Sequence, residues 1–337
     1  MLDRILNKAY RKYYIIAIVI CMIAVIIIFR YINKKKVVTF TVSEDITSLC
    51  LWDDKLIGLT KDGNLIEYDQ TGKERKTNQT NIRYICPNGR LIIKNDGTII
   101  TDLDKTTYEG KVIGKIPGAI SGDTTKSFDL IFIVTENGEL YYHDGDSKMI
   151  TFQYTEPIEG WKRVEYYKNV KKAAINDSGL SLFIINGEVY STWDIINTKS
   201  SINKVSKNYI ITDIVVSVYS ALFLDEQGNV YELYQSMRTD DSFYQPQKVE
   251  QINNAAKVYA VGGQRAVITK DNKVYLWKKE RIHEGKELKY EYYYGEISNT
   301  EWDDILLDGH DYFYAIKDNK VSKIPMTNYC KSSKIRW

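Results

Sequence analysis

Residues 255–279 read AAKVYAVGGQRAVITKDNKVYLWKK, the pattern of three short strands joined by two tight turns. An apolar strand ends at Gly262, a strand of small and apolar residues follows, and a third strand begins after Asp271 and Asn272. Asn tolerates the positive backbone φ that tight hairpin turns require. The stretch therefore predicts an antiparallel sheet unit.

The hairpin at the centre of this unit recurs seven times. Each copy has an apolar strand, a polar turn and a second strand, often with tyrosine near its start. The turn residue is Gly in five copies and Asn in two: Gly63, Gly97, Gly138, Gly187, Gly228, Asn272 and Asn319. Successive turns lie 34, 41, 49, 41, 44 and 47 residues apart. Because Gly and Asn both accept the positive φ that two-residue hairpin turns require, the seven positions are chemically alike, and we expect a positive φ at each.

Other segments complete each repeat. A strand precedes most hairpins, and we expect these strands at 46–52, 170–175, 211–217, 256–262 and 302–308. Stretches such as 150–166 and 236–250 could supply a fourth strand. A repeat of roughly 40–45 residues fits one four-stranded propeller blade.

The hydrophobic pattern distinguishes a propeller from a sandwich. Leu130–Val134 is apolar without alternation, as in a strand covered on both faces. A sandwich strand would have one solvated face and a period of two. The sequence therefore predicts an all-β, seven-bladed β-propeller over residues 37–325, in which segment 37–42 pairs into the last blade and closes the ring.

The N-terminus has a different character. Residues 13–29 (YYIIAIVICMIAVIIIF) carry no charge, and residues 30–32 bring the segment to 20 residues. At about 1.5 Å per residue it spans about 30 Å, the thickness of a bilayer core. No small-residue cleavage site follows, which argues against a cleaved signal peptide. We expect residues 13–32 to be a single transmembrane α-helix in the lipid bilayer.

Domain organisation follows from this segment. Four basic residues precede the span and four follow it closely, so the positive-inside count is tied. A short tail before one span is typical of an uncleaved signal anchor, and we expect a cell-membrane protein with its propeller outside the cytoplasm. The remaining parts are a basic tail (1–12), a basic juxtamembrane segment (33–36) and a C-terminal tail (326–337).

Charge and motifs indicate little chemistry. After residue 36 the chain has 38 basic and 43 acidic residues, a formal charge of −5, which does not suggest a nucleic-acid partner. The three histidines (His143, His283 and His310) fall in different repeats, and neither an H-E-x-x-H motif nor a Walker loop is present. The sequence predicts no catalytic residue, metal site or cofactor.

Three cysteines follow the apolar segment: Cys50, Cys86 and Cys330. The number is odd and the spacings are wide, so neither a disulfide framework nor a zinc site is predicted. Cys50 and Cys86 are expected to be small apolar residues of the core.

Several acids could serve a cation site or acid–base chemistry. Two W-D-D segments, 52–54 and 302–304, lie 11 and 17 residues before their turn residues, so they are not equivalent. We expect them to be solvated turn acids. Asp123, Asp225 and Asp271 are likewise expected in turns.

The run KELKYEYYY, residues 286–294, has four tyrosines: Tyr290, Tyr292, Tyr293 and Tyr294. Tyrosine is enriched at protein interfaces, so the run is a candidate partner-binding surface. The other interpretation is an outer, partly exposed strand of a blade.

The repeat at 255–279 resembles that of the regulator of chromosome condensation family. The matching positions are Val258, Gly262, Val267, Ile268, Asp271, Val274, Tyr275 and Trp277. The resemblance is loose elsewhere across residues 44–324. It implies a seven-bladed propeller that binds other proteins through one face. Lys278 replaces the family's glycine and no G-Q-L-G stretch follows, so its nucleotide-exchange residues do not carry over.

Three functions stay open. The first is a membrane-anchored module that binds a protein or a cell-envelope polymer. The second is an envelope hydrolase or lyase whose acids come from separate blades and meet in the central channel. The third is a structural spacer. The low-proline composition, rich in Lys, Ile, Asn and Tyr, is similar to that of proteins from low-GC bacteria.

Overall fold

The computed structural model describes residues 37–52, 55–101, 103–104, 107–125, 130–143, 154–158, 160–164, 167–176, 180–191, 209–218, 220–234, 246–284, 287–297 and 302–330. For residues 154–158, 234, 279–284 and 287–294 it describes the backbone alone. Val38–Trp337 form one compact unit. The predicted transmembrane helix, 13–32, and its basic flanks lie outside the described residues. Among the described residues no helix is long and apolar enough to cross a membrane.

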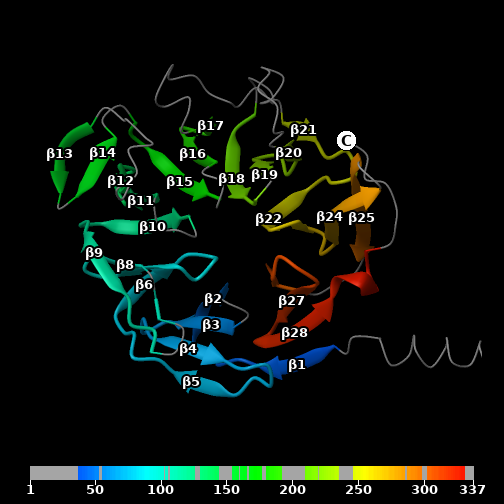
Figure 1. The fold of residues 1–337 in the computed structure, drawn as a ribbon, viewed down its shortest axis with the longest axis horizontal. Coiled ribbons are helices and arrows are strands. Elements are labelled where there is room, and N and C mark those ends of the chain that lie inside the picture. The colour runs from blue at the N-terminus through cyan, green and yellow to red at the C-terminus, as the bar shows by residue number, and fades with distance from the viewer. Residues whose placement is uncertain are drawn as a thin grey trace, which may run out of the picture. The chain divides into compact units, whose positions relative to one another are not determined.

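The described strands form seven antiparallel sheets around a ring, which confirms the predicted propeller (Figure 1). Blade 1 consists of β2 (Ile46–Trp52), β3 (Lys55–Thr60), β4 (Leu65–Tyr68) and β5 (Glu74–Lys76). Blade 2 consists of β6 (Ile82–Ile85), β7 (Leu91–Lys94), β8 (Thr98–Thr101) and β9 (Lys111–Lys115). Blade 3 has five strands in the order β10 (Ala119–Thr124), β11 (Ile131–Thr135), β12 (Leu140–His143), β14 (Trp161–Val164) and β13 (Tyr154–Ile158).

The second half of the ring continues this order. Blade 4 has β15 (Val170–Ile175), β16 (Ser181–Ile185) and β17 (Glu188–Ser191) within the described residues. Blade 5 has β18 (Ile211–Val216), β19 (Ser220–Asp225), β20 (Val230–Tyr234) and β21 (Gln247–Lys248). Blade 6 has β22 (Ala255–Val261), β23 (Gln264–Thr269), β24 (Val274–Glu284) and β25 (Glu287–Ile297). Blade 7 has β26 (Asp304–Leu307), β27 (Tyr312–Lys317), β28 (Lys320–Pro325) and β1 (Val38–Thr41).

Both ends of the propeller sequence meet in blade 7. β1 pairs with β28 in antiparallel register, from Val38 opposite Lys323 to Thr41 opposite Lys320. The Val42 N–H then donates to the Asn319 carbonyl at 2.7 Å. This confirms the closing role expected of segment 37–42. The packed ring also continues past residue 325, because the 3₁₀ turn Met326–Asn328 buries Met326 against blades 6 and 7.

The core is divided among the blade interfaces. Seven clusters of buried apolar side chains lie one between each pair of neighbouring blades, including blades 7 and 1. Every residue of β11, β16, β19 and β23 is buried. A strand covered by a blade on each side has no solvated face, which explains the missing alternation seen in Leu130–Val134.

The seven expected turn residues all have positive φ, between 59° and 85°. Only two turns have two residues, at 186–187 and 318–319, where both residues have positive φ. In the other five, a longer loop ends with a single left-handed Gly or Asn. In blade 1, for example, the Gly63 N–H donates to the Thr60 carbonyl at 3.0 Å. The expected positive φ is therefore confirmed at all seven positions, while the loops differ in length.

Glycine at these turns has a second role, because the next blade begins beside it. The Gly228 carbonyl accepts the Ala255 N–H at 2.8 Å, and Gly63 and Gly138 accept in the same way from Ile82 and Val170. A Cβ on Gly228 would lie 2.8 Å from the backbone of Asn254 and Ala255. These glycines thus bring one blade against the next.

Candidate functional site

The four tyrosines predicted as a partner-binding surface lie in β25, the outer strand of blade 6. β24 and β25 pair over eleven positions, from Val274 opposite Ile297 to Glu284 opposite Glu287. Only Val274–Lys278 also pair with β23. The strands beyond Lys278 and Tyr293 therefore form a two-stranded ribbon, residues 279–284 and 287–292, that continues past the end of β23. The expected outer strand is confirmed from residue 287, whereas its exposure lies outside what the structure describes.

The register divides the four tyrosines. Successive strand residues alternate between the two faces of a sheet. Tyr290, Tyr292 and Tyr294 therefore occupy positions on one face of β25, and Tyr293 occupies a position on the other. The backbone brings three of the four predicted residues to a common face.

A second feature is a series of polar contacts between neighbouring blades, where the innermost strand of a blade turns into the next strand. Asp123 in β10 accepts the Ile175 N–H of blade 4 at 3.0 Å and the Asn88 amide of blade 2 at 3.3 Å. This partly buried carboxylate therefore links three blades. Desolvation raises its pKa to about 6, against the lowering effect of the N–H groups of Ile175 and Thr124. The expectation that Asp123 is a turn residue is wrong, because it lies within a strand.

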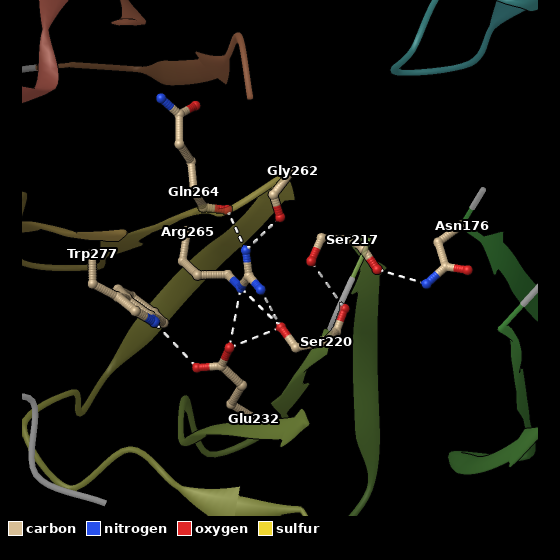
Figure 2. Close-up of polar contacts among 8 residues, drawn as sticks. All are labelled: Asn176, Ser217, Ser220, Glu232, Gly262, Gln264, Arg265 and Trp277. Carbon is tan, nitrogen blue, oxygen red and sulfur yellow. Dashed lines mark hydrogen bonds and ion pairs between the residues drawn. The ribbon is translucent and has the colours of Figure 1, made fainter. Parts of the chain in front are cut away.

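The contacts continue through blades 4, 5 and 6 (Figure 2). The Asn176 amide donates to the Ser217 carbonyl at 2.7 Å. Arg265 of β23 donates from Nε to Glu232 of β20 at 3.1 Å and to the Ser220 hydroxyl at 2.9 Å. The side chains of Arg265 and Glu232 are each 1% exposed. This is a buried ion pair between blades 5 and 6.

The other polar atoms of this pair are also engaged. Arg265 Nη1 donates to the carbonyls of Gly262 at 3.1 Å and Gln264 at 2.8 Å, and Nη2 donates to the Ser220 hydroxyl. The second oxygen of Glu232 accepts the indole N–H of Trp277 at 3.1 Å. Figure 2 shows the guanidinium between the two blades, surrounded by these acceptors. A charge pair satisfied in this way holds two blades together.

Gln264 makes the next link, from blade 6 to blade 7. Its amide nitrogen donates to the Asp308 carboxylate at 3.1 Å, and its amide oxygen accepts the Gly309 N–H at 2.8 Å. We call this series the polar belt. Its side chains come from six successive blades: Asn88, Asp123, Asn176, Ser220, Glu232, Gln264, Arg265 and Asp308.

The two W-D-D segments differ in position, as their different spacing indicated. Trp52 ends β2, and the two acids that follow it are outside the described residues. Asp303 accepts the Asp318 N–H at 3.1 Å, and Asp304 pairs with Lys257 at 3.6 Å. Asp303 therefore caps the last hairpin turn, whereas Asp304 links blade 7 to blade 6.

The two histidines whose side chains are described lie in different blades, 3 and 7. His143 ends β12 and packs against Trp161 with ring centroids 5.3 Å apart and ring planes tilted by 58°, while His310 follows β26 in blade 7. Across the part of the chain that the structure describes, no group of three His, Cys, Asp or Glu residues could hold a metal ion. Asp225 ends strand β19 rather than lying in the turn as expected, and its carboxylate caps that turn by accepting the N–H groups of Gln227 and Asn229.

The expected core cysteines are confirmed. Cys50 is 1% exposed and Cys86 is fully buried, and both are free thiols. Burial raises the pKa of both thiols, that of Cys86 to about 12. A thiol buried in this way is not an activated nucleophile.

The polar belt was missed in the sequence. Arg265 lies two residues after a glycine pair, and Glu232 lies between Tyr231 and Leu233, so each reads as an ordinary polar residue at a turn or on a strand face. They meet because neighbouring blades stack face to face across 33 residues of sequence. Local pattern carries no signal for such a contact.

Comparisons with known proteins bear on the fold. No protein-family model matches the sequence, and no curated protein matches it. Among solved structures, the Myceliophteria thermophila Cps50 (Swd1) β-propeller domain is similar, with a TM-score of 0.52 and 14% identity over 88% of this chain and 100% of that one. This likeness shows the propeller fold.

Two further structures are more distant. Kluyveromyces lactis Hsv2 has a TM-score of 0.45 and 9% identity over 77% of this chain and 88% of that one. Saccharomyces cerevisiae Prp20p, described with its binding to Gsp1p and histones, has a TM-score of 0.44 and 11% identity over 82% and 71% of the two chains.

Proposed function

We propose that this chain is a membrane-anchored binding module whose propeller engages another protein or a polymer of the cell envelope. The observation that carries the proposal is the β24–β25 ribbon. Its last six residue pairs lie beyond the end of β23, so they are not part of the sheet that β24 forms with β23. The acids of the polar belt, by contrast, are held in contacts between blades, which is a structural use.

The anchor belongs to the same proposal. Residues 13–32 cross the bilayer once, the basic tail 1–12 stays in the cytoplasm, and the propeller lies outside. The support is the uncharged length of residues 13–29 and the basic residues at 34–36. The closing strand begins only two residues later, at Val38.

Two measurements test the anchor. The full chain should remain with the membrane after alkaline carbonate extraction, and a variant lacking residues 13–32 should not. Protease added to intact cells should degrade the propeller and leave a short N-terminal fragment. A propeller that is degraded only after the cells are lysed would contradict the proposed orientation.

Affinity capture tests binding. The full chain, solubilised from its native membrane, should retain a specific partner. A variant in which a two-residue Asn-Gly turn replaces residues 279–292 should not retain it. Lys278 and Tyr293 already lie opposite each other, so this turn shortens the ribbon without changing the rest of blade 6. A chain that retains nothing but turns over a saccharide or peptide library would contradict the binding proposal.

A further inference from the structure

The ribbon has two chemically different faces. The register runs without a shift over all eleven pairs, so alternation holds along its length. Within the ribbon, the opposed pairs on one face are Lys279–Tyr292, Arg281–Tyr290 and His283–Leu288. On the other they are Glu280–Glu291, Ile282–Lys289 and Glu284–Glu287. The first set contains cationic and aromatic residues and no acid, and we call it the basic aromatic face.

The distribution of charged residues between the two faces does not stabilise the ribbon itself. Directly opposed residues of opposite charge stabilise a strand pair, and like charges destabilise it. Here acids lie opposite acids at Glu280–Glu291 and Glu284–Glu287, while Lys279 and Arg281 lie opposite tyrosines. An isolated two-stranded ribbon is also marginal in water. The separation of charge between the two faces therefore indicates that the ribbon contacts another molecule.

We propose that the basic aromatic face binds an extended, acidic segment of a partner protein, with carboxylates at alternating residues. This rests on the proposed binding function and names the chemistry of the partner. Lys279 and Arg281 are two residues apart on one strand, about 7 Å. Alternate residues of an extended peptide have the same spacing, so two carboxylates can meet two cations. Tyrosines opposite them add contact area at small entropic cost.

The backbone favours a peptide over a fluid anionic surface. Within the described residues, β24 past Lys278 is paired on one side only, by β25. An extended peptide can add to such an edge through main-chain hydrogen bonds. The face also has the opposite sign to the chain after residue 36, whose formal charge is −5. Charge complementarity therefore favours binding of an acidic partner segment at this face over binding elsewhere on the acidic propeller.

Matched variants separate the two faces. Lys279→Glu and Lys289→Glu change the net charge equally but lie on opposite faces, as do Tyr292→Ala and Tyr293→Ala. The probe is a fluorescein-labelled octapeptide of alternating Glu and Thr, titrated with the full chain in a neutral detergent. Its controls are alternating Lys and Thr, and a block peptide of four Glu and four Thr. Fluorescence anisotropy gives the Kd.

We expect Lys279→Glu to weaken binding of the alternating Glu peptide about tenfold and Lys289→Glu by less than about twofold. Tyr292→Ala should weaken it more than Tyr293→Ala. Equal effects on both faces, or equal affinity for the block peptide, would overturn the inference. So would the absence of peptide binding together with binding to vesicles containing phosphatidylserine that Lys279→Glu abolishes. If Lys279→Glu retains the captured partner in full, the binding function stands and this inference fails.

Discussion

Asp123 is the residue through which pH should act on the stability of the ring. Burial raises its pKa to about 6, from an ordinary 3.8. The folded state therefore favours the protonated form, and this contribution is fully present below pH 3.8 and lost as the pH rises through 6. The loss is at most about 3 kcal/mol, because one pKa unit corresponds to about 1.4 kcal/mol.

Asp123→Asn should remove this pH dependence. The amide oxygen can still accept the Ile175 N–H, and no charge is buried. The variant should be more stable than the natural chain at pH 8 and about equal at pH 4, as measured by urea unfolding across that range. A constant difference in free energy at every pH would contradict the assignment. Asp96 is the control, because the Thr98 N–H and Lys115 lower its pKa and Asp96→Asn should therefore be destabilising at neutral pH.

Arg265 shows what a buried charge requires. Arg265→Met leaves the Glu232 carboxylate buried without its cation, which should cost about 3–5 kcal/mol of unfolding free energy. The double variant Arg265→Met/Glu232→Gln removes both charges and should recover most of that loss. Chemical denaturation of the three proteins checks this. Lys115→Met breaks a half-exposed pair with Asp96 and should change stability by less than about 1 kcal/mol.

At the scale of the elements, two glycines separate backbone strain from crowding. Gly118 has φ +75° with nothing within 4 Å of an added Cβ, whereas Gly228 has φ +85° and would place its Cβ 2.8 Å from the next blade. Gly118→Ala should cost about 1–2 kcal/mol from φ alone. Gly228→Ala should cost at least about 3 kcal/mol, because the blades must also move apart. Thermal and urea unfolding measure the loss of stability in both variants. Equal losses would show that the next blade can move away from a Cβ at residue 228 without cost.

The elements show where sequence-based prediction succeeds. Strands expected at 46–52 and 170–175 are β2 and β15, because an apolar run bounded by turn residues is a local property. The extra strand of blade 3 was not foreseen, since β13 and β14 form their own hairpin and enter the sheet in reversed order. Turn length was not predicted either, because a positive φ at one Gly fits both a two-residue turn and the end of a longer loop.

For the whole molecule, the repeat spacing predicts seven blades and the apolar segment 37–42 predicts closure. Residues of the polar belt could not be foreseen, because Asp123 and Ile175 are brought together only when two blades stack. The faces of the ribbon likewise depend on register, which joins Lys279 to Tyr292 rather than to a neighbour along the chain. Sequence thus identified the tyrosines of the candidate site, and the pairing of β24 with β25 divided them.

Ring closure gives a prediction at this scale. A chain beginning at Val37 should fold like the full propeller, whereas one beginning at Ser43 loses β1 and the buried Val42. The second truncation should lower the unfolding free energy by about 3 kcal/mol or more. Amide hydrogen exchange should rise first along β28. Equal protection of β28 in both truncations would show that β1 does not hold the ring closed.

The position of β1 also determines how the protein bears mechanical force. Any pull on the chain before Val38 is transmitted first to the four residue pairs between β1 and β28 and to the Val42–Asn319 hydrogen bond. The event that needs the least force is then the release of β1 from β28, while the other six blades keep all their strands. A force on the N-terminus would therefore open the ring at the β1–β28 pairing before any other blade unfolded.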